Sequence, residues 1–265
     1  MYKLVVCDLD GTLLNAEHRL GAYSQAVLGR LRAEGVEIML ASGRHFQDIR
    51  RLSDQLGGKG CLISSNGAAV HDRQARLVHR STIDPQCVDF LVGDPVFAKV
   101  HTNVFRSEDW LVARPEPELL AYHRDSGFSY RVTDLGAMEQ DDVLKIFFYG
   151  EPQHLRWLDA LVLERYGDRL TTTFSLPVTL EVMAHGVSKG TALERMAERL
   201  GIALEEVIAF GDGLNDLEML GRVGKGVVMG NADPRLKESL HHLERIGSHR
   251  DESVAHYLEE LFLNR

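Results

Sequence analysis

The feature that most constrains the fold is the alternation of short apolar runs with amphipathic segments. The apolar runs lie at residues 3–9, 36–41, 61–64, 207–210 and 226–229. Apolar residues recur at helical spacing in residues 20–34, 45–57, 188–200, 214–221 and 233–240. Buried strands that alternate with amphipathic helices are typical of a parallel sheet covered on both faces. The sequence therefore predicts the α/β class, with a hairpin at residues 69–80.

The middle of the chain has a different pattern. Alternating stretches predict strands of a more antiparallel sheet at residues 98–105, 109–114, 143–150 and 179–185. Helices are expected near 116–126 and 152–166, and Phe147 and Phe148 are expected to fill the core of this part. The strand–helix alternation resumes after residue 184. We therefore predict a discontinuous core domain, residues 1–81 plus 184–265, with residues 82–183 inserted as a second domain.

Charge and cysteine content limit the partners of the chain. Its 30 lysines and arginines stand against 39 aspartates and glutamates, a formal net charge of −9, which argues against nucleic acid because phosphate backbones bind basic surfaces. No apolar run approaches the roughly 20 residues of a membrane helix, and three scattered cysteines form no disulfide framework. We therefore expect a cytoplasmic enzyme without a nucleic-acid, membrane or obligatory protein partner. A small phosphorylated substrate would need a metal ion or placed cations.

Two carboxylates, Asp8 and Asp10, follow the first apolar run and precede a Gly-Thr pair. In an open parallel sheet, polar residues that follow the strands meet at one edge, where ligands bind. One carboxylate could attack a substrate while the other exchanges protons, if their surroundings keep them in different protonation states. The alternative is a strand that ends at a solvated aspartate and a type I turn.

Two further segments could bind an anion. Ser42, Gly43 and Arg44 offer a hydroxyl, backbone N–H groups and a guanidinium at the start of a helix. An ordinary serine N-cap is the alternative. Lys189, at the head of the 188–200 helix, could bring a positive charge to a phosphate, although most lysines are only solvated.

Residues 211–216 form an oxygen-rich segment directly after the apolar run at 207–210. Asp212, Asn215 and Asp216 supply two carboxylates and an amide, which suits Mg²⁺ because this ion prefers hard oxygen ligands. An Asp/Gly turn with a capping aspartate is the alternative. Together the four segments supply a metal site, an anion site, a nucleophile and an acid/base.

These segments, in this order, resemble the four motifs of the haloacid dehalogenase (HAD) superfamily. The matching residues are DLDGT at 8–12, Ser42 within ASGR, Lys189 within SKG and GDGLND at 211–216. Residues 82–183 are similar to the cap of the Cof-type phosphatases of that superfamily. The resemblance implies a Rossmann-like core with a parallel sheet and an inserted α+β cap of type IIB. It also implies a Mg²⁺-dependent phosphatase of small phosphorylated metabolites that forms an aspartyl-phosphate.

The resemblance also implies the catalytic and metal-binding roles. Asp8 would attack phosphorus, and Asp10 would protonate the leaving oxygen and later activate water. Mg²⁺ would lie between the Asp8 carboxylate, the main-chain carbonyl of Asp10 and the Asp212 carboxylate. Asp216 would orient the waters of the metal ion without binding it directly.

The remaining motif residues would bind the phosphate. Ser42, the N–H group of Gly43 and Lys189 would hold its non-bridging oxygens. Asn215 would touch the phosphate or the surroundings of the metal. The inserted cap would close over the cleft and select the leaving group. Four residues are candidates for that selection: Arg44, Asn66, His101 and Glu181.

Four segments resemble the family members that act on hydroxymethylpyrimidine pyrophosphate, a thiamin-pathway intermediate. They are HTNVFRSEDW (101–110), SGFSYR (126–131), MGNADPRL (229–236) and HRDESVAHYL (249–258). Pyridoxal phosphate, flavin mononucleotide and sugar phosphates are alternative substrates. Two other functions stay open: a receiver-like module that uses phosphorylated Asp8 as a signal, and a phosphomutase or phosphotransferase on the same scaffold.

Overall fold

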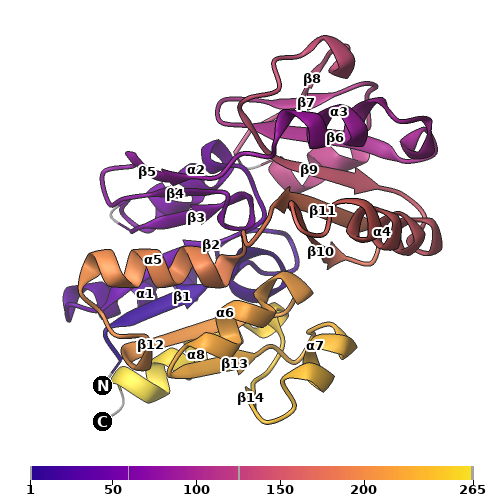
Figure 1. Ribbon diagram of the computed structural model, residues 1–265. Helices are drawn as coiled ribbons and strands as arrows, with labels where there is room; N and C mark the ends of the chain where they lie inside the picture. The colour runs from indigo at the N-terminus through magenta and orange to yellow at the C-terminus, as the bar shows by residue number, and fades with distance from the viewer. Residues whose placement is uncertain (1, 59, 125, 264–265) are drawn as a thin grey trace.

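The computed structural model describes residues 2–58, 60–124 and 126–263. Within these residues the strands form two sheets, which lie side by side in Figure 1. The first sheet has the order β14-β13-β12-β1-β2-β3-β4-β5, and the second has the order β10-β11-β9-β6-β7-β8. Residues 1, 59, 125 and 264–265 of the predicted ranges lie outside the described residues.

The first sheet is mostly parallel. Its parallel strands are β1 (Leu4–Cys7), β2 (Glu37–Ala41), β3 (Leu62–Ser64), β12 (Val207–Gly211), β13 (Lys225–Val228) and β14 (Glu244–Arg245). An antiparallel hairpin, β4 (Ala69–His71) and β5 (Leu77–Arg80), extends it. The predicted α/β class and hairpin are therefore confirmed. In the register of the central strands, Val5 of β1 lies opposite Ile38 of β2 and Ile208 of β12.

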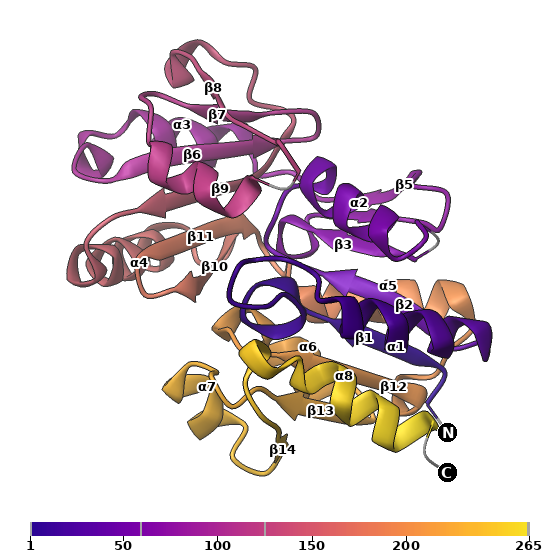
Figure 2. The same ribbon diagram turned by 180° about the vertical axis from the view of Figure 1, so that it is seen from behind.

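Helices cover both faces of this sheet. Helices α1 (Ala22–Ala33) and α8 (Ser253–Leu258) lie on one face, and α5 (Lys189–Leu200) and α6 (Leu217–Arg222) lie on the other (Figures 1 and 2). Two more helices, α2 (Phe46–Gln55) and α7 (Pro234–Ser239), flank the sheet. Every helix of the described ranges is too short or too polar to cross a lipid bilayer.

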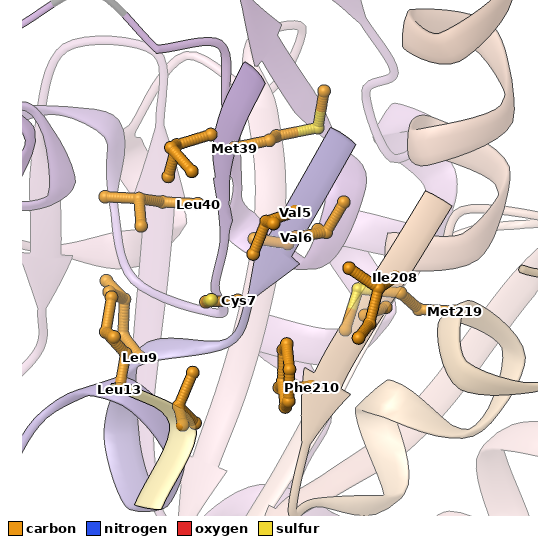
Figure 3. Close-up of a cluster of buried hydrophobic side chains, with 14 of the residues drawn as sticks. Val5, Val6, Cys7, Leu9, Leu13, Met39, Leu40, Ile208, Phe210 and Met219 are labelled. Atoms are coloured by element: carbon orange, nitrogen blue, oxygen red, sulfur yellow. The ribbon is translucent and has the colours of Figure 1, made fainter. Parts of the chain in front are cut away.

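The centre of the first sheet is an apolar core. All four residues of β1 are fully buried. Figure 3 shows side chains of β1, β2 and β12 meeting there, with Phe210 and Met39 among them. Each fully buried side chain of this size stabilises the fold by roughly 1.5–3 kcal/mol relative to leaving it exposed. The loops that follow these strands therefore start from rigid positions.

The second sheet is antiparallel except where β7 meets β8. Its strands are β6 (His101–Arg106), β7 (Trp110–Val112), β8 (Arg131–Val132), β9 (Val143–Tyr149), β10 (Leu170–Leu176) and β11 (Thr179–Ala184). Helices α3 (Pro85–Gly93) and α4 (Pro152–Tyr166) pack on one face through a shared apolar cluster. The opposite face carries a separate aromatic cluster that includes Phe105, Trp110 and Phe147.

One predicted helix has a different form. Residues 116–126 were expected to be helical, but the structure has a 3₁₀ turn at Pro117–His123. A segment this short gains little from its own hydrogen bonds, so tertiary contacts decide its form: His123 binds Asp48, and Leu119 packs in the aromatic cluster. The helix expected at 152–166 is present as α4. The division of the chain at residues 81/82 and 183/184 stays a prediction.

Candidate active site

The predicted site residues lie after three adjacent parallel strands. Asp8 follows β1, Ser42 follows β2 and Asp212 follows β12. Because β1 lies between β2 and β12, its carboxyl end is where the chain connections diverge to either side of the sheet. Ligands of open α/β sheets bind at such a point. The structure thus brings together segments that are far apart in the sequence.

Lys189 is a buried cation between two carboxylates. It occupies the first turn of α5, where Ser188 is the N-cap and forms a capping box with Thr191. Its Nζ donates to Asp8 Oδ1 at 2.5 Å and to Asp216 Oδ1 at 2.7 Å. Burial alone would lower the pKa of Lys189, but the two carboxylates raise it above its ordinary value. Lys189 is therefore charged at neutral pH.

Asp216 holds the loop that carries Asp212. Its Oδ2 accepts hydrogen bonds from the backbone N–H groups of Asp212 and Gly213, both at 2.9 Å. Its other oxygen accepts from Lys189. Asp216 thus fixes both the Asp212 loop and the Lys189 ammonium group. This arrangement is compatible with the prediction that Asp216 does not bind the metal ion directly.

Three carboxylates gather at this point. One oxygen each of Asp8, Asp212 and Asp216 lies within 4.8 Å of the other two. Asp212 Oδ1 also accepts from the Thr12 hydroxyl at 2.9 Å. Gly11 has a φ of +78°, and a Cβ there would lie 2.2 Å from Asp212 Oδ2. Only glycine therefore allows the Asp8–Thr12 turn to approach Asp212 this closely.

The electrostatics of the carboxylate cluster favour a cation. Burial and repulsion from Asp216 raise the pKa of Asp212 to about 7. Burial is also the main cause of the raised pKa of Asp8, which Lys189 opposes while Asp216 and Asp212 add to it. Lys189 is a single positive charge against these three carboxylates. A divalent cation with oxygen ligands fits the donor set and would remove the repulsion.

Asp10 has different surroundings. Arg44 binds it through two parallel hydrogen bonds, Nε to Oδ2 and Nη2 to Oδ1, each 2.6 Å long. His18 Nδ1 donates to Asp10 Oδ1 at 3.1 Å. Burial would raise the pKa of Asp10, but Arg44 and His18 hold it well below its ordinary value. The surroundings therefore shift the pKa values of the two carboxyl groups in opposite directions, that of Asp8 upward and that of Asp10 downward.

Ser42 and Gly43 follow β2, the strand next to the one that precedes Asp8. The Ser42 hydroxyl accepts a hydrogen bond from the backbone N–H of Arg44 at 3.1 Å. The carbonyl of Gly43 accepts from Lys145 Nζ at 2.6 Å. A Cβ at Gly43 would lie 3.0 Å from Asn66 Oδ1, so a larger residue there would press on the neighbouring amide.

A network of polar side chains joins the two sheets beside Gly43. Asn66, at a φ of +56° in the turn after β3, donates to Glu181 Oε2 at 2.8 Å and accepts from Asn215 Nδ2 at 3.1 Å. Lys145 forms a buried ion pair with Glu181. Burial lowers the pKa of Lys145, whereas Glu181 opposes the shift. The charged side chains of β9 and β11, Lys145 and Glu181, are thus bonded to carbonyl and amide groups in the loops of the first sheet.

A cavity of about 410 Å³ connects these groups. Asp8, Asp10 and Asp212 line it from the first sheet, and Phe105, Trp110, Phe147, Lys145 and Glu181 line it from the second. The aromatic side chains of the second sheet therefore face the carboxylates of the first sheet across the cavity. Such an enclosure suits a ligand with a flat, partly apolar body, and a cation held by the carboxylates would let the other end of that ligand be anionic.

The predicted residues differ in how they meet this cavity. Besides the three aspartates, five predicted residues line it: Ser42, Gly43, Arg44, Glu181 and Asn215. His18, which was not predicted, lines it as well. Asn66 lines a second cavity of about 560 Å³ that also borders Lys189 and Asn215.

His101 is not brought to the active-site cavity. Its Nε2 bonds to the carbonyl of Arg114, and its Nδ1 accepts from the Asn103 amide. His101 is on the same face of β6 as Phe105 but lies about 13 Å farther along the strand, at 3.3 Å per residue. The expectation that His101 faces the leaving group is not supported.

Both phenylalanines pack in cores of this part of the chain, as expected. Phe148 is fully buried in the cluster under α3 and α4, and Phe147 belongs to the aromatic cluster of the opposite face, where it also lines the cavity. Lys145 and Phe147 are two residues apart on β9 and so share a face. Strand alternation predicts that Lys145 and Phe147 share a face, but it does not predict that this face borders the cavity.

Comparison with known proteins decides the family. A family model of haloacid dehalogenase-like hydrolases matches residues 5–258. The chain belongs to the haloacid dehalogenase-like hydrolases. As a member of this family it is an enzyme. Its predicted fold class is confirmed by a structural match to a HAD subclass IIB sugar phosphatase. The match has a TM-score of 0.85 and 20% identity and covers 98% of both chains.

Several relatives of this HAD-like hydrolase are closer in sequence. An "HMP-PP phosphatase" of Enterobacter sp. (strain 638) is 39% identical over 97% of this chain and 95% of its own. The protein of that name from Klebsiella pneumoniae (strain 342) is 38% identical over the same shares. A haloacid dehalogenase-like hydrolase from B. subtilis has a TM-score of 0.85 and 29% identity, covering 98% of this chain and 100% of that one.

Proposed function

We propose that this HAD-like hydrolase is a Mg²⁺-dependent phosphatase that forms an aspartyl-phosphate on Asp8. The observation that carries the proposal is the Asp8 carboxylate, held by Lys189 at 2.5 Å beside Asp212 on the floor of the cavity. A carboxylate fixed by a buried cation at a strand end is a suitable nucleophile for phosphoryl transfer. The sequence and fold of the family support the same assignment.

The metal would be held by Asp8 and Asp212, with the main-chain carbonyl of Asp10. Mg²⁺ is the proposed ion because the available donors are hard oxygens. When bound, it would neutralise the negative charge shared by nucleophile and substrate. Asp216 would contribute indirectly, because its own oxygens are engaged by Lys189 and by the backbone of the Asp212 loop.

Two displacements would complete the reaction. First, an Asp8 oxygen forms a bond to phosphorus while the bond between phosphorus and the leaving oxygen breaks. Ser42, the N–H of Gly43 and Lys189 would hold the non-bridging oxygens as charge develops on them. Second, Asp10 takes a proton from water, whose oxygen attacks phosphorus, and the Asp8 carboxylate is restored as phosphate leaves. Asn215 would complete the phosphate site.

The surroundings of Asp10 bear on the substrate class. Arg44 stabilises Asp10 as a carboxylate, which suits its role as a base. Protonating a leaving alkoxide would require that ion pair to break. A diphosphate substrate avoids this demand, because its leaving group is a phosphate ester of low basicity. The ion pair therefore favours a phosphoanhydride over a simple phosphate ester.

We propose HMP-PP, hydroxymethylpyrimidine pyrophosphate, as the substrate to test first. It combines a diphosphate with a flat heteroaromatic ring, and relatives at 38–39% identity carry its name. Phe105, Trp110 and Phe147 would pack against the ring, and Lys145 with Glu181 would meet its polar edge. Pyridoxal phosphate, flavin mononucleotide and sugar phosphates are the alternatives.

Residues 82–183 are proposed to be the cap that supplies these contacts, inserted into a core of residues 1–81 and 184–265. Glu181 and Asn66 would act in selection from the two sides of the core–cap junction, because they are hydrogen-bonded to each other. A cytoplasmic location stays a prediction from composition. The three cysteines, Cys7, Cys61 and Cys87, are free and buried.

The test is phosphate release from a panel of phosphorylated metabolites, with Mg²⁺ and with EDTA, for the wild type and Asp8→Asn. We expect Mg²⁺-dependent release that is lost in the variant, with HMP-PP giving the highest kcat/KM. Release that is unchanged by EDTA or by the substitution would contradict the mechanism. A higher kcat/KM for another panel member would replace HMP-PP as substrate and leave the mechanism intact. Transfer of the phosphate to a sugar rather than to water would identify a phosphotransferase instead.

A further inference from the structure

Both side chains that bind Asp10 are connected to the 117–123 turn of the proposed cap, His18 directly and Arg44 through Asp48. His18 donates to Asp10 Oδ1, and its ring lies edge-on to the ring of Tyr122 with 4.7 Å between centroids. Arg44 also binds Asp10 and connects to the turn through a second carboxylate, Asp48. Two consecutive residues of one turn therefore reach the partners of the proposed base: Tyr122 contacts His18, and His123 binds the carboxylate that holds Arg44.

The connection through Asp48 is buried and continuous. Arg44 Nη1 donates to Asp48 Oδ2 at 3.0 Å, and His123 Nδ1 donates to the same oxygen at 2.7 Å. Asp48 is completely buried on α2, and Arg44 and His123 are each less than a tenth exposed. Inside a protein, charged hydrogen bonds of this kind are stronger than in water and fix the geometry of both partners.

The geometry gives each group in this series of hydrogen bonds a defined task. Asp48 binds the one end of the guanidinium, Nη1, that Asp10 does not use, so it sets the rotation of Arg44 about its long axis. That rotation aims Nε and Nη2 at the two oxygens of Asp10. His123, which comes from the second sheet's side of the junction, fixes Asp48 only when the 117–123 turn lies against α2.

We propose that Asp48 and His123 are positioning residues that orient Asp10 through Arg44, so that the base is aligned only while the cap turn contacts the core. The proposal rests on the proposed function, in which Asp10 activates water in the second displacement. Neither Asp48 nor His123 touches the reacting atoms. Their effect should therefore be confined to the step that needs Asp10 as a base.

p-Nitrophenyl phosphate separates the two displacements. Its leaving group needs no proton, so kcat/KM reports binding and transfer to Asp8, whereas kcat also contains hydrolysis of the aspartyl-phosphate. We expect Asp48→Asn and His123→Gln to lower kcat about tenfold while changing kcat/KM less than about threefold, since a positioned base contributes more than this in total. A burst of p-nitrophenolate in the first turnover should accompany the lower kcat.

Arg51→Gln is the matched control. Arg51 is also on α2 and also reaches across the junction, where it donates to the carbonyl of Ser126, but it is not part of the chain to Asp10. We expect this variant to show no burst and no selective loss of kcat. A structural role of the contact would instead lower kcat and kcat/KM together in all three variants.

The outcomes separate this inference from the proposed function. Wild-type turnover that requires Mg²⁺, with variants that lose kcat and kcat/KM in equal proportion and show no burst, would overturn the positioning role alone. A wild type without Mg²⁺-dependent turnover of any substrate would overturn the proposed function and the positioning role with it. Should Asp48→Asn fail to fold, His123→Gln still decides, because it leaves the Arg44–Asp48 pair in place.

Discussion

The ammonium nitrogen of Lys189 lies 2.5 Å from Oδ1 of Asp8; Lys189 is fully buried, and Asp8 is exposed only where it lines the cavity. A second carboxylate, Asp216, accepts from the same nitrogen at 2.7 Å. Two negative charges that would repel each other in the interior are thus held around one positive charge. Lys189 therefore has a structural task as well as its proposed task in binding phosphate.

Replacing Lys189 with methionine should destabilise the fold strongly. The substitution preserves much of the side-chain volume but leaves Asp8 and Asp216 buried without their cation, which typically costs about 3–5 kcal/mol. Urea unfolding at pH 7 without metal measures the change. Lys225→Met is the control, because its partially exposed ion pair with Glu244 is worth less than about 1 kcal/mol. A Lys189→Met protein as stable as Lys225→Met would contradict this account.

Mg²⁺ should stabilise the protein more at high pH than at low pH. The pKa of Asp212 rises from 3.8 to about 7 in the fold, so between these values the folded state binds more protons than the unfolded state. Without metal, stability is therefore lost as pH rises from about 4 through 7. Mg²⁺ binds the ionised carboxylates and restores it. We expect a larger Mg²⁺-induced rise in Tm at pH 8 than at pH 5.5.

Two variants test whether this response belongs to the carboxylate cluster. Asp212→Asn should abolish the Mg²⁺-induced rise in Tm at pH 8. Asp84→Asn should retain it, because this exposed N-cap of α3 lies outside the cluster and asparagine is an equally good cap. An unchanged response in Asp212→Asn would place the metal elsewhere.

Acidification should weaken the fold through His45. This buried residue accepts a hydrogen bond from the Gln47 N–H at Nδ1 and donates from Nε2 to the Arg106 carbonyl, so it is held neutral. Burial lowers its pKa from 6.5 to about 4. Its stabilising contribution is complete above pH 6.5 and is lost as pH falls toward 4, by up to about 3 kcal/mol.

Urea unfolding at pH 6.8 and pH 4.5 measures this contribution. His45→Asn keeps an N-cap for α2 but removes the titrating ring. We expect the variant to lose less stability than the wild type between the two pH values. The same loss in both proteins would show that another group is responsible.

Phe147 should select for substrates with an aromatic leaving group. Phe147→Leu should raise KM for HMP-PP about tenfold, the equivalent of one aromatic stacking contact, and leave KM for acetyl phosphate unchanged. Phe148→Leu is the control, because the neighbouring ring packs under α3 and α4 and should affect stability rather than KM. An equal change in KM for both substrates would exclude ring recognition by Phe147.

Strand-end reasoning predicted the positions of Asp8, Ser42 and Asp212 because the carboxyl ends of adjacent parallel strands must meet. The same reasoning could not place His101, since polarity at one position does not say how far along a strand the cavity lies. The Lys145–Glu181 pair depends on the register of β9 against β11, where Glu181 lies opposite Phe147. No local pattern specifies that register.

Contacts between the two sheets were also beyond local prediction. Asp48 and His123 are 75 positions apart, and nothing in either segment marks the other as its partner. The sequence predicted a helix at 116–126 and did not predict the 3₁₀ turn that carries His123. The pair meets because the 117–123 turn lies against α2.

The most direct test of the central claim is the mass of the Asp8 peptide after acid quench. Asp10→Asn should lack the base for the second displacement, so that p-nitrophenyl phosphate and Mg²⁺ leave a phosphoryl group on the enzyme. We predict an increase by the mass of one phosphoryl group on the peptide that contains Asp8, and no increase when Asp8→Asn is added. Turnover in the wild type with a phosphoryl group on another residue, or on none in Asp10→Asn, would contradict Asp8 as the nucleophile.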